Sequence, residues 1–399
     1  MIAASFFLWG ILRSLDDLLV ALFQAAGTLR YATAMQIHAS FFSAYLVASI
    51  PAGYLLRRNG YRRLLVCSVM LMALGSAICA PALWTNSFQL CLIGVFIVAL
   101  GIAVLQTTSN PCIGLLGPEH SATARLLLVQ AFVTLGSALG PLTGLALFGG
   151  WTRSTQSAPL VFPGTMLAQI YGCLTLGLIA LATLLWMYFA NDRVIIQGHT
   201  EGIGWHLMRN PRLAFGGAAV FLYVGTEASI LGHSIPYLSQ QSSSLRPGTA
   251  AMLLSAYWVA AIAGRLCFSA LLLRFRTRTL LQAACLVATL LLLCSIYCAG
   301  AYSAACLLAT GFFNAAIFPC VFTLSVTGLQ KAELPHASAL LSTAICGGGL
   351  MPMVSGVLAD HAGIAAAFVL PCLAYLFIAG GAQLAFPQEF HLRPARSTK

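Results

Sequence analysis

The feature that most constrains this chain is a succession of twelve long apolar stretches separated by short polar segments. A helix needs about 20 apolar residues to cross the roughly 30 Å hydrocarbon core of a bilayer. The ten-residue alternation that marks transmembrane β-barrel strands is absent. The sequence therefore predicts an all-α integral membrane protein with twelve transmembrane helices, over residues 4–26, 32–56, 64–84, 88–114, 126–148, 165–189, 213–238, 249–273, 280–300, 304–329, 338–359 and 364–386.

Composition excludes a water-soluble fold. Only 7% of the 399 residues are charged and 60% are hydrophobic, whereas soluble domains carry roughly 25% charged residues to cover their surface. The first apolar stretch is not read as a secretory signal peptide, because no basic segment precedes it and no A-x-A site follows it. The thirteen cysteines form no CxxC pair and no Cys/His spacing suited to zinc. We expect no metal and no bound cofactor.

The basic residues predict how the chain is oriented in the membrane. With both termini in the cytoplasm, 15 of the 20 Lys and Arg residues fall in cytoplasmic segments and two, Arg13 and Arg265, fall within spans. Only Arg30, Arg153 and Arg246 are left outside. Positively charged loops resist translocation, so this asymmetry predicts a multi-pass membrane protein with both termini in the cytoplasm. The net charge of +11 is thus attributed to orientation, and not to nucleic-acid binding.

The two halves of the chain echo each other. The longest polar segment between spans, residues 190–212, is predicted to be a cytoplasmic linker between six-helix bundles at 1–189 and 213–399. Such a duplication is the usual plan of rocking secondary transporters, and small residues four apart allow close helix packing. Three landmarks recur at offsets of about 210 residues: Gly53 with Gly264, Pro111 with Pro319, and Gly136, Gly140 and Gly144 with Gly348, Pro352 and Gly356.

Particular segments resemble a known transporter family. The loop after Gly53 resembles the signature G-x-x-x-D-R-x-G-x-R-R of the major facilitator superfamily, with Arg57 in place of the usual acidic residue. More specific segments are similar to the fucose–galactose–glucose symporter family, and together they cover essentially the whole chain. The resemblance implies the major facilitator fold and the cation-coupled import of a sugar. These segments are FFLWG (6–10), LDDLL (15–19), AVLQTTSNPCIGLLG (103–117), FLYVGTEAS (221–229), AYW (256–258) and GFFNAAIFP (311–319).

The resemblance assigns the coupling role to Asp17, which matches the family's acidic residue in the first helix. Ionisable groups at bilayer depth are costly and therefore mark functional sites. Arg13 lies four residues earlier on the same helical face, so an ion pair with Arg13 is the structural alternative for Asp17. Asp16 points about 100° away, and we expect it to be the solvated or loop-facing neighbour.

The same resemblance proposes a sugar site. At the position of Gln106 the fucose branch carries a second acid, whereas the glucose/galactose branch carries a glutamine. The resemblance therefore leaves H⁺ and Na⁺ both open as the coupling ion, without a second acid at this position. Carbohydrate sites combine aromatic platforms with a few polar groups. The alternative for Gln106 is a hydrogen bond to the helix backbone that is broken near Pro111. The alternative for Trp258 is packing in the core. His38 replaces a usual glutamine and is either titratable or packed. The predicted sugar-binding residues are Asp17, His38, Gln106, Asn110, Gln130, Tyr223, Glu227, Trp258 and Asn314.

Other functions are also considered. A gate on the cytoplasmic side is expected to involve Arg57, Arg58, Arg62, Arg63 and Arg265. The segment 136–144, GSALGPLTG, resembles the G-x-x-x-G-P-x-x-G pattern of antiporters, so a proton-driven exporter of a small molecule is the alternative. An enzyme is disfavoured, since the chain has no HExxH and no Ser–His–Asp candidates near one loop. We expect a monomer whose partners are a small sugar and the lipid bilayer.

Overall fold

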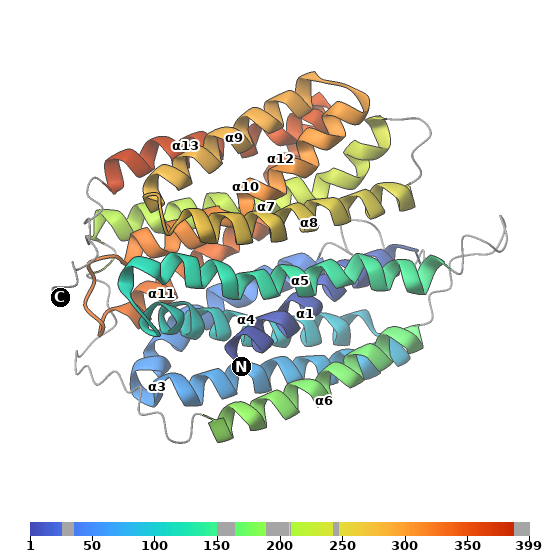
Figure 1. Ribbon diagram of the computed structural model, residues 1–399. Coiled ribbons are helices and arrows are strands. Elements are labelled where there is room, and N and C mark those ends of the chain that lie inside the picture. Colours follow the sequence, from blue (N-terminus) through green and yellow to red (C-terminus); the bar gives the residue numbers. More distant parts are fainter. Residues whose placement is uncertain (26–35, 150–163, 189–206, 208, 242–246, 387–399) are drawn as a thin grey trace.

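The computed structural model describes residues 1–25, 36–149, 164–188, 207, 209–241 and 247–386 (Figure 1). Within them every regular element is a helix, and the long helices run side by side. Short 3₁₀ segments occur at Glu119–Ser121, Ala344–Cys346 and Ile364–Phe368. The α-helices are α1 (Ile2–Ala25), α3 (Gln36–Trp84), α4 (Phe88–Leu115), α5 (Ala122–Gly149), α6 (Gly164–Tyr188), α7 (Pro211–Gln241), α8 (Pro247–Leu271), α9 (Thr277–Tyr297), α10 (Gly300–Val326), α11 (Leu334–Thr343), α12 (Gly347–Ala362) and α13 (Val369–Ala385).

These helices cover all twelve predicted spans. In the described part of the chain, ten helices are long and apolar enough to cross a membrane, and α1 accounts for the first predicted span. The helix α3 contains two spans, which are separated by a kink at Gly60. Gly60 has a φ of 77°, which glycine adopts without the steric cost that a side chain would add. The predicted membrane fold is confirmed, with boundaries within a few residues of those expected.

Apolar side chains cover the outside of the structure as well as its inside. Leu176, Leu290 and Val357 lie in the middle of α6, α9 and α12 and are 70%, 59% and 56% exposed. A soluble protein rarely exposes large apolar patches. Lipid tails are as apolar as these side chains, so the exposed positions are the surface that faces the bilayer.

The helices before the predicted linker (α1–α6, the first half) and those after it (α7–α13, the second half) pack mainly among themselves. The first half is built on contacts of α3 with α4 and α6 and of α1 with α5, whereas the second half is built on contacts of α10 with α8 and α9 and of α7 with α12. The halves meet chiefly through α5 with α8 and α3 with α11. The predicted linker lies mostly outside the described residues, so its boundaries stay a prediction.

Glycines set the closest helix contacts in each half. A Cβ atom on Gly136 of α5 would lie 2.2 Å from the carbonyl oxygen of Phe7 in α1. In the second half, a Cβ on Gly347 would lie 2.1 Å from the carbonyl oxygen of Phe221 in α7. Small residues let two backbones approach this closely. Gly136 in span 5 and Gly347 in span 11 therefore have equivalent packing roles. The sequence predicted Gly348, and not Gly347, as the counterpart of Gly136. The side chains at positions 140 and 144 lie outside the described residues.

Candidate functional site

The first helix places the carboxylate of Asp16 inside the protein. Asp16 is only 1% exposed. The prediction that Asp16 is solvated is therefore wrong, because the helices that α1 contacts, α5 together with α3, α4 and α6, cover this side chain. The backbone of Asp17 continues α1, and its side chain lies outside the described residues. The guanidinium of Arg13 lies 5.0 Å from the centre of the Phe41 ring in α3, a cation–π contact.

Two amides of α4 are buried one turn apart, as their spacing predicts. Gln106 is 5% exposed, and its Nε2 donates a hydrogen bond of 2.9 Å to the hydroxyl of Tyr45. Asn110 is 2% exposed, and within the described part of the chain neither of its amide atoms has a hydrogen-bond partner. A buried amide without a partner costs about 1–3 kcal/mol. Asn110 therefore keeps unused hydrogen-bonding capacity inside the protein.

Gln130 of α5 is held by a residue of the other half. Nη1 of Arg265 in α8 donates a hydrogen bond of 2.7 Å to Oε1 of Gln130. Gln130 is 6% exposed, and Arg265 is partly buried. One predicted sugar-binding residue and one predicted gating residue thus form a charge-assisted bond between the halves, of the kind that is stronger than a neutral one.

The second half contains a connected polar network around Asn314. The hydroxyl of Tyr223 lies 3.0 Å from Oε1 of Glu227 and 2.9 Å from the carbonyl oxygen of Asn314. The Asn314 amide donates a bond of 2.8 Å to the hydroxyl of Tyr257 and accepts one from the hydroxyl of Tyr375. Asn314 is completely buried. Its amide is therefore engaged by two tyrosines, unlike the cavity-facing position that we expected.

Tyr257 and Tyr375 did not emerge from the sequence as site residues. The signal that would have found them is a tyrosine in an apolar helix, since a buried hydroxyl needs a partner. Trp258 is partly buried and packs edge-to-face on the Tyr257 ring at 5.6 Å between centroids. His38 is also partly buried and lies in the first turn of α3.

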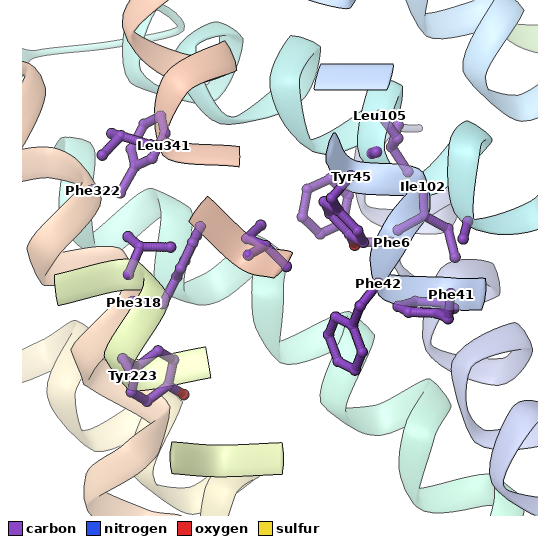
Figure 2. Close-up of a cluster of buried hydrophobic side chains, with 14 of the residues drawn as sticks. Phe6, Phe41, Phe42, Tyr45, Ile102, Leu105, Tyr223, Phe318, Phe322 and Leu341 are labelled. Atoms are coloured by element: carbon purple, nitrogen blue, oxygen red, sulfur yellow. The ribbon is translucent and has the colours of Figure 1, made fainter. Parts of the chain in front are cut away.

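Aromatic side chains from the two halves stand on opposite sides of the region between them (Figure 2). Phe41, Phe42 and Tyr45 come from α3, and Tyr223 and Phe318 come from α7 and α10. The hydroxyl of Tyr223 is directed toward the first half (Figure 2). A Cβ on Gly348 would lie 2.2 Å from the ring of Phe42, so α12 and α3 also touch here.

Four of the five predicted gating arginines occupy one end of the helices, where Arg125 also lies. We call this end the basic end and define it by Arg57, Arg58, Arg62, Arg63 and Arg125. Nη1 of Arg57 lies 3.4 Å from Nε2 of His336 in α11, across the two halves. Arg62 instead binds within the first half, where it donates 2.7 Å to the carbonyl oxygen of Trp186 and stacks on that ring. Arg58 and Arg63 are exposed. Among the described residues, the structure thus connects Arg57 and Arg265 to the opposite half, and not the other three predicted gating arginines.

Three further contacts bring the halves together near the basic end. A Cβ on Gly53 would lie 2.9 Å from the carbonyl oxygen of Pro335, so this glycine lets α3 touch α11. The hydroxyl of Ser338 donates 2.9 Å to the carbonyl oxygen of Thr107 in α4. The hydroxyl of Ser269 donates 3.2 Å to the carbonyl oxygen of Ala124. In this structure the halves are therefore in contact at the basic end.

These positions suit recognition of a small polar molecule and not bond chemistry. Amide, hydroxyl and carboxylate groups can exchange hydrogen bonds with hydroxyl groups of a ligand, and aromatic faces can pack against its carbon skeleton. The groups come from both halves, so their relative positions change whenever the halves move.

Comparisons with known proteins agree with this arrangement. The family model that matches is the Major Facilitator Superfamily, over residues 2–351 and 224–398. The chain is 32% identical to the glucose/galactose transporter of Brucella abortus biovar 1 (strain 9-941) over 379 residues, which cover 94% of this chain and 90% of that relative. It is 29% identical to the L-fucose-proton symporter of Escherichia coli (strain K12) over 399 residues, which cover 95% of this chain and 91% of that relative.

The structure is similar to a crystal structure of the Major Facilitator Superfamily transporter FucP in the outward conformation. The TM-score is 0.80 at 27% sequence identity, with 96% of this chain and 97% of that chain covered. The chain therefore belongs to the Major Facilitator Superfamily, a family of transporters and not of enzymes, in which it is related to L-fucose symporters and bacterial glucose/galactose transporters.

Proposed function

We propose that this protein is a secondary active transporter that imports a monosaccharide, such as a hexose or deoxyhexose, by cation-coupled symport. It works in the bacterial cytoplasmic membrane with both termini in the cytoplasm, so that the basic end faces the cytoplasm. The relatives named for glucose, galactose and L-fucose support a sugar as the substrate class. The coupling cation is H⁺ or Na⁺.

The observation that carries the proposal is the set of buried and partly buried polar side chains contributed by both halves. Polar groups inside a membrane protein are costly and face the interior of the bundle, where they mark substrate or ion pathways. Gln106 and Asn110 come from the first half, and Tyr223 and Glu227 come from the second. Asn110 supports ligand binding most directly, because its amide is buried and has no hydrogen-bond partner among the described residues.

Transport proceeds by rocking of the two halves around these residues. The contacts at the basic end close the cytoplasmic side, and the likeness to FucP in its outward conformation supports the same assignment. Sugar and cation enter from outside, and the basic end then opens to release them. A ligand can drive such a change only if it binds the two states with different affinity. We assign that differential binding of the cation to Asp17.

The structure accounts for the first glycine of the pattern that motivates the antiporter alternative, whereas the side chains at positions 140 and 144 lie outside the described residues. The glycine pattern of span 5 suggested an exporter, but Gly136 is explained by its contact with the carbonyl oxygen of Phe7 in the same half. A packing role of this kind requires glycine whatever the direction of transport.

The test is uptake of labelled D-glucose, D-galactose and L-fucose into proteoliposomes under imposed proton or sodium gradients. The wild type should concentrate at least one sugar. Asp17→Asn should retain exchange of labelled for unlabelled sugar and lose gradient-driven accumulation, because an amide cannot carry the coupling charge. Asp360→Asn, at the end of α12, is the matched control and should accumulate sugar normally.

Two results would contradict the proposal. Unchanged accumulation by Asp17→Asn would remove this residue from coupling. A wild type that shows counterflow of none of the three sugars would favour the antiporter.

A further inference from the structure

An open cavity lies in the second half, on the same side of the protein as the basic end. Its volume is about 400 Å³, within the range of pockets that take small ligands. The start of α7, the segment that follows α10 and the end of α13 form its walls, and α7 contacts both α10 and α13. The segment after α10 leads into α11, where the backbone of Pro335 meets Gly53 close to the basic end.

The cavity lies where three membrane spans end. The span of α7 begins at Pro211, the span of α10 ends at Val326, and the last span ends at Ala385. All three residues line the cavity or directly precede a residue that lines it. Leu384 is also part of the lining, and its side chain is 83% exposed on the outside of α13. The cavity is therefore level with the lipid headgroups, and its outer edge faces the lipid.

One cation reaches into this cavity. Nη1 of Arg212 in α7 would lie 4.0 Å from a Cβ atom on Gly328, so the guanidinium extends from α7 to the segment after α10. Arg212 is partly buried, and its guanidinium makes no hydrogen bond or ion pair in the part of the chain that the structure describes. None of the described residues that line the cavity is acidic. A partly buried cation without a counter-charge favours the binding of an anion.

The other arginine near this cavity is already engaged. Nη1 of Arg278 donates a hydrogen bond of 2.9 Å to the carbonyl oxygen of Phe386, just after α13. The ring of Phe386 packs on Phe215 of α7 at 5.5 Å between centroids. A Cβ atom on Gly381 would lie 2.1 Å from that Phe215 ring. These contacts fix α7 against α13, so two walls of the cavity are held in place while Arg212 keeps its donors unused.

The rest of the lining is largely apolar. Leu329 and Ala385 are partly buried beside Arg212, and Leu384 is exposed at the outer edge. A ligand that matches this surface carries a negative charge next to an apolar part. A free phosphate ion has the charge without the apolar part, whereas a phospholipid has both and surrounds the protein in the membrane. Basic pockets between membrane-spanning helices bind anionic headgroups for the same reason.

We propose that this cavity binds the phosphate group of an anionic phospholipid from the membrane leaflet on the side of the basic end. The planar guanidinium of Arg212 donates two parallel hydrogen bonds to the phosphate oxygens, and an acyl chain packs against Leu384. The bound headgroup joins the start of α7 to the segment that leads into α11. The site requires neither a sugar nor a particular direction of transport.

The experiment measures the thermal unfolding of the full-length protein in dodecyl maltoside while lipid is added. Dioleoyl phosphatidylglycerol is the probe, and dioleoyl phosphatidylcholine has the same acyl chains with a headgroup of no net charge. A ligand that binds only the folded protein raises its unfolding temperature. Phosphatidylglycerol should therefore stabilise the wild type at lower concentration than phosphatidylcholine, and added salt should weaken the difference, because salt screens charges near the surface.

Variants of the cation locate the effect. Arg212→Gln should lower the apparent affinity for phosphatidylglycerol roughly tenfold, by the strength of a charge-assisted hydrogen bond, and should leave the response to phosphatidylcholine unchanged. Arg212→Lys should fall between the two, because an ammonium group cannot bind the phosphate with a planar fork. The matched control is Arg209→Gln, which removes the same charge from an exposed residue outside the lining. It should respond to phosphatidylglycerol as the wild type does.

Several results would overturn the proposal. Equal responses of the wild type to the two lipids would show that the headgroup charge is not recognised. A wild-type response in Arg212→Gln, or an equal loss in Arg209→Gln, would remove Arg212 from the site. Stabilisation by glycerol 1-phosphate or inorganic phosphate at the same concentration as the lipid would show a soluble ligand instead. If Arg212→Gln is not monodisperse, Ala385→Trp decides: it narrows the cavity and keeps the guanidinium, so an unchanged phosphatidylglycerol response would contradict the site.

Discussion

The contact between α1 and α5 yields a prediction whose sign comes directly from the geometry. Gly136→Ala adds a Cβ atom 2.2 Å from the carbonyl oxygen of Phe7 and 2.9 Å from the backbone nitrogen of Ile11. Both neighbours are backbone atoms, so no side-chain rotation can relieve the overlap. Real Cβ atoms essentially never come closer than 3.0 Å to such atoms. The two helices would have to separate by about 0.8 Å, the difference between these distances.

The size of the effect follows from that separation. A gap of about 0.5–1 Å forfeits a quarter to a half of the dispersion energy of the atoms that line it. Overpacking of a tight interface costs about 1–3 kcal/mol, whereas replacing glycine by alanine within a helix contributes up to about 1 kcal/mol in the opposite direction. We therefore expect Gly136→Ala to be destabilising by about 1–2 kcal/mol.

The assay is thermal unfolding of the detergent-purified protein, followed by the loss of the monodisperse peak. Gly347→Ala is the equivalent change in the second half, where a Cβ would lie 2.1 Å from the carbonyl oxygen of Phe221. Both variants should unfold at lower temperature than the wild type. The control is Gly172→Ala in α6, where a Cβ meets nothing within 4 Å, and it should be neutral or stabilising. Equal unfolding temperatures for Gly136→Ala and Gly172→Ala would refute the reasoning.

Two further predictions concern single polar side chains. Arg125 donates hydrogen bonds to the carbonyl oxygens of Ile113 and Gly114 at the end of α4, so Arg125→Lys should lower the unfolding temperature. Arg58→Lys is the control and should not lower it, because Arg58 is exposed. Equal decreases in unfolding temperature for the two variants would contradict this role of Arg125. Gln106→Leu should weaken sugar binding roughly tenfold, measured by ligand-induced thermal stabilisation. Gln106→Leu also leaves the Tyr45 hydroxyl without the hydrogen bond from Gln106. Adding Tyr45→Phe should therefore restore the unfolding temperature but not the affinity for sugar. Recovery of both quantities would exclude a sugar contact for Gln106.

Much of the fold could be predicted because one physical requirement dominates it. Each helix must present enough apolar residues to cross the hydrocarbon core, and its backbone hydrogen bonds must be satisfied within the segment. Both requirements are local, so the twelve spans could be recognised without knowledge of their neighbours. The kink at Gly60 and the tight contact at Gly136 also left a local signal, because each needs the absence of a side chain.

The candidate site could be predicted only in part. Gln106 and Asn110 are buried one turn apart, as helical periodicity predicts for residues four apart. Periodicity could not tell that Asp16 faces the protein, since nearly every face of α1 is apolar. Nor could it show that Asn314 is enclosed by tyrosines from two other helices.

The amino-acid sequence by itself determined that this chain spans the membrane twelve times, and the distribution of its arginines predicts which ends of the helices are cytoplasmic. Tertiary structure alone decided which polar groups meet: Asp16 turned inward, Gln130 held by Arg265, and Glu227 joined to Tyr223. The physical reason is that membrane insertion depends on the summed apolarity of each segment. A hydrogen bond between distant segments depends instead on the rotation and separation of two packed helices.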